Sequence, residues 1–211
     1  MHLGHLLARH GRYRPDHLAV VFEQHRLTWR QLDARVNRVA NALLAAGLVK
    51  GDKVATILPN CLEQLDVYWA AARTGLVVVP MSPLLQESGL LSLLDNCEAR
   101  FVLSTSAYAD TLARVRDKLP AVRADRWVLT DGARPGFRAW ADLVGAAPES
   151  APPDPQLTGD DPYNIIYSSG TTGEPKGIVH THDVRAGYAT LFASAFRMTP
   201  ESVCLHAGSI V

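Results

Sequence analysis

The sequence predicts an α/β fold in which helices flank a mostly parallel sheet. Three observations support this prediction: short apolar runs recur along the chain, amphipathic stretches of helical length separate them, and Gly or Pro stands at many boundaries. Continuous apolar strands that alternate with helices are typical of parallel sheets covered on both faces. With 211 residues, 47% of them hydrophobic, the chain is long enough to bury a substantial core.

The amino-terminal residues are expected to form a short amphipathic helix ahead of Pro15. Three histidines in this stretch suggest a metal site, but no matching acidic or cysteine set accompanies them, so the helix is favoured. They are His2, His5 and His10.

A strand at 19–22 and a polar turn at 23–26 are expected next. A long helix then begins at Thr28, whose hydroxyl can cap the N–H of Gln31 while the Gln31 side chain reaches back. Gly47 ends this helix. Its apolar stripe consists of Leu32, Val36, Val39, Leu43 and Leu44.

The alternation of strands and helices continues. A strand is expected at 54–58, followed by a helix with an apolar face formed by Leu62, Leu65 and Trp69. The further elements are a strand at 77–79, a helix at 88–96, a strand at 101–103, a helix at 108–119 and a strand at 127–129.

A proline-rich stretch from Ala146 to Pro162 is expected to be an extended connection over the surface. After it, a helix is expected to begin at Thr181 or Asp183 and to run to about Arg197. The chain therefore divides into three units. They are an α/β sheet unit at 1–146, the connection at 147–162, and a phosphate-loop segment at 163–211 that begins a further sheet unit.

The segment 168–177 combines hydroxyls, glycines and a lysine between two strand-like runs, 163–167 and 178–180. Small residues let backbone N–H groups approach an anion, and Ser, Thr and Lys side chains add donors, so the pattern predicts a phosphate-binding loop. It is not a Walker loop, because the glycines are too close together and Gly177 follows the lysine. The alternative is a plain surface turn, since these residue types are common in turns. A Gly-x-Ser-x-Gly hydrolase elbow is absent.

The run SSGTTGEPKG, with Ile-Ile-Tyr before it and Ile-Val-His-Thr-His after it, resembles the signature loop of the adenylate-forming enzymes. This superfamily includes the acyl-CoA synthetases and other AMP-dependent ligases. The stretches 27–32, 51–55 and 71–80 resemble early landmarks of the same superfamily. Its later landmarks are not found in the sequence, so the resemblance implies a partial N-terminal domain, that is, an N-terminal fragment.

The resemblance implies that the parent enzyme activates a carboxylic acid, such as a fatty or aromatic acid, with ATP. Acyl-adenylate and pyrophosphate would form, and the acyl group would then pass to coenzyme A. A catalytic role is implied for Thr172 and Lys176. Contacts with the nucleotide phosphates are implied for Ser168, Ser169, Gly170, Thr171, Thr172, Gly173, Lys176 and Gly177.

The implied co-substrates and cofactors are ATP, coenzyme A and Mg²⁺, with the Mg²⁺ ligand outside this chain. The fragment alone is expected to be inactive. The alternative is a non-catalytic module or truncated remnant that binds a nucleotide or phosphate without turnover.

Composition narrows the classes of partner. Lys plus Arg and Asp plus Glu both number 21, so there is no basic excess to favour nucleic acid. The 3 cysteines are far apart and odd in number, which argues against a disulfide framework and a zinc site and favours the cytoplasm. Neither a secretory signal nor a membrane span is expected. A homodimer is possible.

The last residues, 203–211, form an apolar run that predicts an interior strand cut from its continuation. His206 is expected beside that strand and partly buried, with a structural role favoured over a role in an acyl pocket. His182 resembles a frequent histidine of acyl-CoA synthetases, and a capping or packing role is favoured over catalysis.

Overall fold

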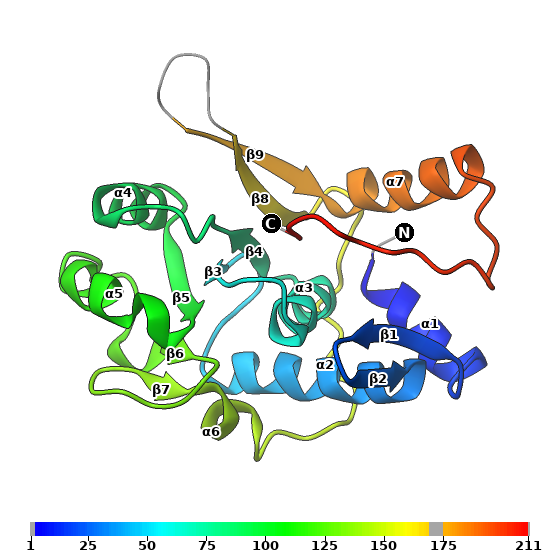
Figure 1. Cartoon of the computed structure of the whole chain (residues 1–211), viewed down its shortest axis with the longest axis horizontal. Coiled ribbons are helices and arrows are strands. Elements are labelled where there is room, and N and C mark those ends of the chain that lie inside the picture. Colours follow the sequence, from blue (N-terminus) through cyan, green and yellow to red (C-terminus); the bar gives the residue numbers. More distant parts are fainter. Residues whose placement is uncertain (1–2, 169–174, 211) are drawn as a thin grey trace.

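The computed structural model describes residues 3–168 and 175–210 and shows an α/β body from which one hairpin extends (Figure 1). Within the described residues, a seven-stranded sheet has the order β7-β6-β5-β3-β4-β8-β9, and every pair is parallel except β8–β9. The prediction of a mostly parallel sheet is confirmed. Its strands are β3 (Lys53–Ile57), β4 (Val77–Pro80), β5 (Ala99–Ser104), β6 (Trp127–Leu129), β7 (Arg138–Ala139), β8 (Pro162–Ser168) and β9 (Lys176–Thr181).

Helices cover both faces of this sheet, as the apolar strands predicted. The α-helices are α1 (Gly4–Tyr13), α2 (Trp29–Ala45), α3 (Leu62–Thr74), α4 (Glu87–Asn96), α5 (Ala109–Arg116), α6 (Trp140–Val144) and α7 (His182–Ala195). Two 3₁₀ turns, η1 (Ser106–Tyr108) and η2 (Ala124–Arg126), are also present. None of the helices in the described ranges combines the length and apolar character that a bilayer span requires.

The core consists of two clusters, because successive strand residues point to opposite faces. Val54 and Phe101 face the cluster built with α1, α2 and α3, whereas Ala55 and Val102 face the one built with α4 and α5. The elements expected between 54 and 129 agree with the structure to within a few residues. The two-residue strand β7 and the short helix α6 were not predicted.

The start of α2 confirms the predicted capping box. The Thr28 hydroxyl accepts a hydrogen bond from the Gln31 amide at 3.3 Å, and the Thr28 amide donates to Gln31 Oε1 at 2.9 Å. The turn before it was predicted too long. His25 and Arg26 belong to strand β2 (His25–Thr28), which pairs with β1 (Leu18–Phe22), because the reversal needs only the two residues 23–24.

Helix α3 is buried on several sides rather than along the one predicted stripe. Leu65 and Trp69 are only half-buried, while Gln64, Asp66 and Arg73 are buried. Burial of polar side chains requires partners, and two of the three find theirs on α2. Arg35 donates to both carboxylate oxygens of Asp66, and the Arg73 guanidinium donates to Asn37 and Asp33. These contacts fix α3 against α2.

The proline-rich stretch after α6 runs beside α2 and contains no helix or strand between 147 and 161. Asn37 donates to the Glu149 carbonyl, and Asn41 donates to the carbonyls of Pro148 and Ser150 at 2.9 Å each. The connection is therefore held by side-chain bonds to its backbone. The division into three units stays a prediction.

The prediction of a strand at 203–211 is wrong for the described part of that range. Residues 203–210 adopt no strand, and Val203 and Leu205 are 97% and 91% exposed. A strand needs a hydrogen-bonded neighbour, and no described strand pairs with this run. The segment instead lies near α3, where Asn60 bonds the Gly208 carbonyl and the Ile210 amide. His206 is exposed rather than partly buried.

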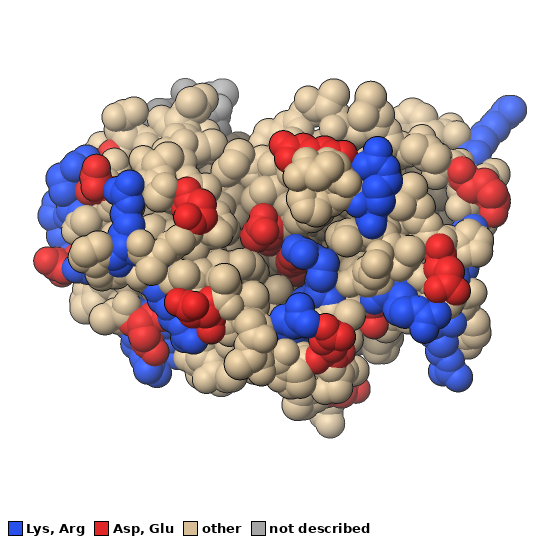
Figure 2. Space-filling view, turned by 60° about the horizontal axis from the view of Figure 1, so that its bottom comes forward, with Lys and Arg blue, Asp and Glu red and all other residues tan. Residues whose placement is uncertain are grey.

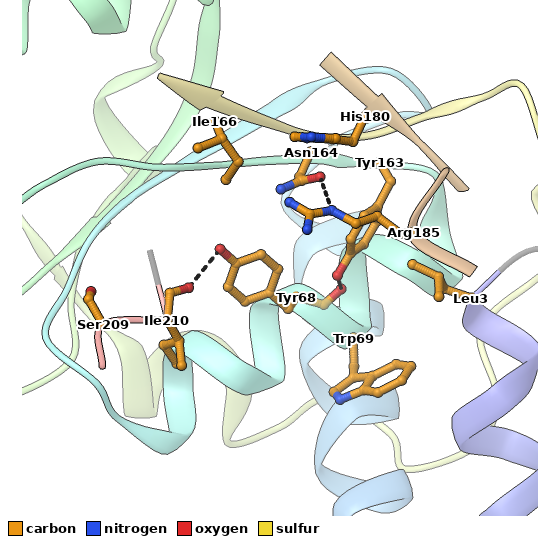
Figure 3. A pocket seen from close by; sticks show the side chains of 10 residues that line it. All are labelled: Leu3, Tyr68, Trp69, Tyr163, Asn164, Ile166, His180, Arg185, Ser209 and Ile210. Carbon is orange, nitrogen blue, oxygen red and sulfur yellow. Dashed lines mark hydrogen bonds between the residues drawn. The ribbon is translucent and has the colours of Figure 1, made fainter. Parts of the chain in front are cut away.

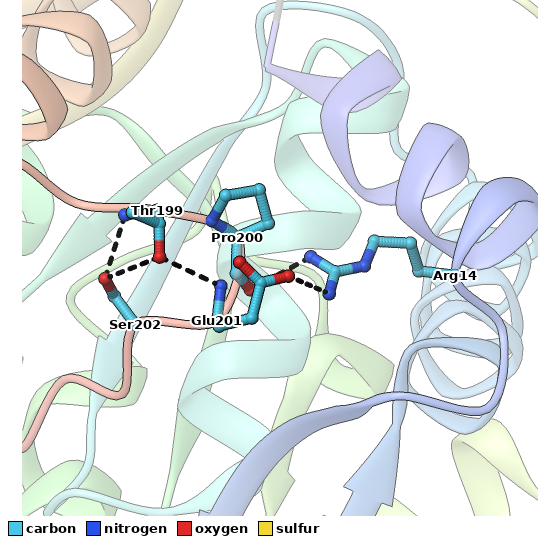
Figure 4. A network of polar contacts seen from close by, with 5 residues as sticks. All are labelled: Arg14, Thr199, Pro200, Glu201 and Ser202. Atoms are coloured by element: carbon cyan, nitrogen blue, oxygen red, sulfur yellow. Dashed lines mark hydrogen bonds and ion pairs between the residues drawn. The ribbon is translucent and has the colours of Figure 1, made fainter.

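Residues 199–202, just before this segment, contact Arg14 at the end of α1. Arg14 donates to the Pro200 carbonyl at 2.9 Å and to the Glu201 carboxylate at 3.2 Å, while Thr199 and Ser202 close a local turn (Figure 4). The first helix and the residues after α7 are therefore neighbours.

Candidate functional site

The candidate site lies at the outer end of the β8–β9 hairpin. In the antiparallel register, Ser168 pairs with Lys176 and Tyr167 pairs with Gly177. Ser168 and Lys176 are both exposed, so two of the predicted phosphate-binding residues oppose each other at the base of the loop. A third predicted residue, Gly177, lies beside Lys176 in β9. The other predicted residues lie outside the described residues and are Ser169, Gly170, Thr171, Thr172 and Gly173.

The Lys176 side chain is available for an anion. Among residues 3–168 and 175–210, no carboxylate forms an ion pair with it and no side chain or backbone atom hydrogen-bonds its ammonium group. An exposed ammonium group beside a hydroxyl supplies a cation and a donor to a phosphate. The role of both side chains in phosphate binding stays a prediction.

One anchor of the hairpin is Tyr167, whose hydroxyl donates to Asn96 Oδ1 at the end of α4 at 2.5 Å. Burial raises the pKa of Tyr167 to about 12, so the phenol keeps the proton that it donates. Gly177 lies in β9 against this ring. A Cβ there would be 3.1 Å from Ile165 Cγ2 and 3.2 Å from Tyr167 Cε1, so the missing side chain of Gly177 lets the two strands and the ring pack closely.

The other end of the hairpin is fixed by the start of α7. Thr181, one of the two predicted caps, accepts a hydrogen bond from the Val184 amide at 3.3 Å. His182 is fully buried, accepts from the Leu3 amide through Nδ1 at 3.3 Å, and lies 5.4 Å from the Tyr163 ring. The favoured packing role of His182 is confirmed.

Sequence reasoning missed the polar pair Asn164 and Arg185. Asn164 is 1% exposed inside β8, and Arg185 Nε donates to its Oδ1 at 3.1 Å. An asparagine within an otherwise apolar strand was the available signal, because buried amides need partners.

Charge on the visible surface is mixed. Figure 2 shows basic and acidic side chains interspersed over one face of the molecule. Within the described ranges, no group of three or more His, Cys, Asp or Glu side chains is placed to hold a metal ion. The position of a Mg²⁺ ligand stays a prediction.

A family model described as "AMP-binding enzyme" matches residues 7–211. The chain belongs to this family. The resemblance noted in the sequence is thereby confirmed, because the matched range includes the loop and all three early landmarks.

Similar curated proteins of the AMP-binding family are CoA ligases. The long-chain-fatty-acid–CoA ligase FadD13 of Mycobacterium tuberculosis is 34% identical over 170 residues, which are 80% of this chain and 32% of FadD13. The crotonobetaine/carnitine–CoA ligase of Escherichia coli is 31% identical over 177 residues, 82% of this chain and 34% of that enzyme. The chain spans about a third of the length of these relatives.

Solved structures confirm the fold class. The anthranilate CoA ligase AuaEII, in complex with anthranoyl-AMP, matches with a TM-score of 0.85 and 25% identity over 92% of this chain and 37% of its own. ATP-bound MatB from Rhodopseudomonas palustris matches with a TM-score of 0.83 and 30% identity, over 100% of this chain and 41% of that one. The N-terminal domain of FACL13 from M. tuberculosis matches with a TM-score of 0.80 and 30% identity, over 92% of this chain and 47% of that one.

Proposed function

We propose that this chain supplies the phosphate-binding part of an ATP-dependent acid–CoA ligase. The observation that carries the proposal is the register of the β8–β9 hairpin, which places Ser168 opposite Lys176 at the two ends of the loop. Membership of the AMP-binding family and the CoA ligases among its relatives support the reaction class.

The described residues have distinct roles in this proposal. Lys176 supplies a positive charge to the nucleotide's β- and γ-phosphates, and Ser168 supplies a hydroxyl donor. Gly177 and Tyr167 keep the two strands in register so that both groups face the same phosphates. The hydroxyls of Ser169, Thr171 and Thr172 complete the set of donors, and Thr172 and Lys176 stabilise the charge of the departing pyrophosphate.

The whole reaction joins the acid to AMP, releases pyrophosphate and then forms a CoA thioester. Mg²⁺ bound to the triphosphate would lower its charge, with ligands outside this chain. The acid, the coenzyme A acceptor, the homodimer and the cytoplasmic location all stay predictions.

Calorimetric titration of the chain with pyrophosphate and with ATP tests the binding role. Lys176→Ala should weaken both affinities by about tenfold or more, because a hydrogen bond to a charged group contributes about 1.5–3 kcal/mol. Lys118→Ala is the matched control, since that exposed lysine lies outside the hairpin, after α5, and pairs with Glu87. Equal affinities in the two variants would reject the assignment.

The second candidate is a module that binds phosphate without turnover. An adenylation assay on the 211 residues alone separates the two, and adenylate formation by this chain alone would exclude the module. In a longer protein that contains the chain, Thr172→Ala or Lys176→Ala should slow acid-dependent ATP–pyrophosphate exchange about 10²- to 10³-fold.

A further inference from the structure

The β8–β9 hairpin extends beyond the strand next to it (Figure 1). β8 pairs with β4 at the single position Asn164–Val78, whereas its pairing with β9 continues to Ser168. Residues 166–168 and 176–178 form the free end of the hairpin, and no third strand lies beside them among the strands that the structure describes. A two-stranded hairpin without further support is only marginally stable in water.

The two faces of the free end have different support. Ile166 is half-buried and lines a cavity of about 530 Å³ between the hairpin and α3 (Figure 3). On the opposite face, Ile165 and Tyr167 pack against the cluster built with α4 and α5. Because side chains alternate along a strand, Tyr167 is the last residue on that face of β8 before the strand ends at Ser168.

A single hydrogen bond joins the free end to the body within the described residues. The Tyr167 hydroxyl donates to Asn96 Oδ1 at 2.5 Å. Asn96 is the last residue of α4, and this helix is held in the core by the buried side chains of Leu90, Leu93 and Leu94. Helix α4 therefore offers a fixed point to a part of the hairpin that has little other support.

Tyr167 lies next to the proposed phosphate-binding pair in the ladder. It opposes Gly177, and the following pair is Ser168 opposite Lys176. Directly opposed side chains on one face of an antiparallel pair lie close together, so these two can bind one phosphate group only while the strands keep this register. A site that is formed for part of the time has an affinity reduced by that fraction.

We propose that Asn96 is a positioning residue for phosphate binding. It touches no phosphate itself, but its bond to Tyr167, 71 positions later in the chain, holds Ser168 and Lys176 in the arrangement that the anion requires. The inference rests on the proposed function and extends it to α4. Its physical basis is preorganisation, since a site that is already ordered loses less conformational entropy on binding.

Calorimetric titration with pyrophosphate tests the inference on the whole chain. Asn96→Leu keeps the size of the side chain but removes the acceptor, and should weaken pyrophosphate binding about three- to tenfold, the contribution of one hydrogen bond. Tyr167→Phe keeps the ring against Gly177 and should have the same effect. Asn41→Leu is the matched control and should leave the affinity unchanged, because Asn41 also holds a distant segment but bonds the proline-rich connection.

The double variant separates positioning from a general loss of stability. If the two side chains act through their mutual hydrogen bond, Asn96→Leu should weaken binding no further once Tyr167→Phe is present. Hydrogen exchange of the amides at 165–168 should be faster in both single variants than in the unmodified chain, and unchanged in Asn41→Leu. Urea unfolding reports that each variant is folded under the conditions of the titration.

The possible failures are distinct. Unchanged affinity in Asn96→Leu, additive effects in the double variant, or an equal loss in Asn41→Leu would overturn the inference and leave the proposed function intact. Failure of the unmodified chain to bind pyrophosphate would reject the proposed function and this inference with it.

Discussion

Strands β3 and β9 belong to one sheet but have very different surroundings. Val54 of β3 is fully buried, whereas Ile178 and Val179 of β9 are 47% and 54% exposed. β3 pairs with a strand on each side and lies between two clusters of helices, while β9, among the strands that the structure describes, is an edge strand paired only with β8. The body therefore gains its stability from packing, and the hairpin that carries the candidate site depends on a few anchors.

The anchors of the hairpin are individual side-chain contacts, two polar and one between rings. The Tyr167 hydroxyl bonds Asn96, His182 packs against Tyr163, and the Asp161 carboxylate bonds Lys50. Regions with few buried apolar contacts open locally at lower free energy than the core. We therefore expect hydrogen exchange to be faster in β8 and β9 than in β3 and β5.

The sharpest contrast should come from apolar truncation in the two regions. Phe101→Ala removes a fully buried ring from β5 and should lower the free energy of unfolding by about 3–5 kcal/mol. Val179→Ala removes an exposed side chain and should change the free energy of unfolding by less than about 0.5 kcal/mol. Urea unfolding measures both. A loss of comparable size in the two variants would contradict the contrast.

Removal of a buried charge should have the next largest effect. Arg73→Met removes the guanidinium that bonds the Asp33 carboxylate and the Asn37 amide oxygen, and should destabilise the chain by about 3 kcal/mol. Arg114→Met breaks an exposed pair with Glu87 and should cost less than about 1 kcal/mol. If thermal unfolding shows the two variants to be equally stable, the network between α2 and α3 does not fix the body.

Two glycines test the packing of the hairpin and its helix. Gly177→Ala places a Cβ against Ile165 and Tyr167 and should destabilise the hairpin by about 1–3 kcal/mol. Gly187→Ala in α7 meets no atom within 4 Å and should stabilise the helix by about 0.5–1 kcal/mol. Hydrogen exchange of the β8, β9 and α7 amides measures the changes, and shifts of the same sign would refute the packing argument.

The smallest effect should come from Asp161. The Thr158 amide and Lys50, which donate to its carboxylate, hold the pKa of Asp161 below its ordinary value of 3.8. A carboxyl group whose pKa is lower in the folded state stabilises the fold at pH values above its ordinary pKa. This stabilisation is lost as the pH falls through the lowered pKa.

Asp161→Asn should thus be less stable than the unmodified chain at pH 7, and the difference should shrink below about pH 4. Asp160→Asn, at the exposed neighbour, is the control. A difference that does not change between pH 7 and pH 3 would assign the effect to something other than ionisation.

Local signals in the sequence predicted most of the body. The capping box at Thr28 depends on residues three positions apart, and the strands at 54–58 and 101–103 are apolar because they are buried on both faces. Such features need no knowledge of distant residues. The parallel arrangement also followed, because helices separate the strands.

The predictions that failed concern features that depend on residues distant in the sequence. An apolar run such as 203–210 becomes a strand only beside another strand, and the sequence does not say which one. The burial of Gln64 and Asp66 on α3 requires helices on several sides. At the candidate site, the loop could be predicted from its sequence motif. The pairing of Asn164 with Arg185 could not, because Arg185 lies on a helix that follows the hairpin.

The hydrogen bond between the Leu3 amide and His182 joins residues 179 positions apart. During synthesis, helix α1 leaves the ribosome early but must wait for α7 before this contact can form. Contacts between such distant positions form late and slow the final step of folding. The amino-terminal helix should thus reach its native setting only after α7 has been made, together with the hairpin that carries the loop.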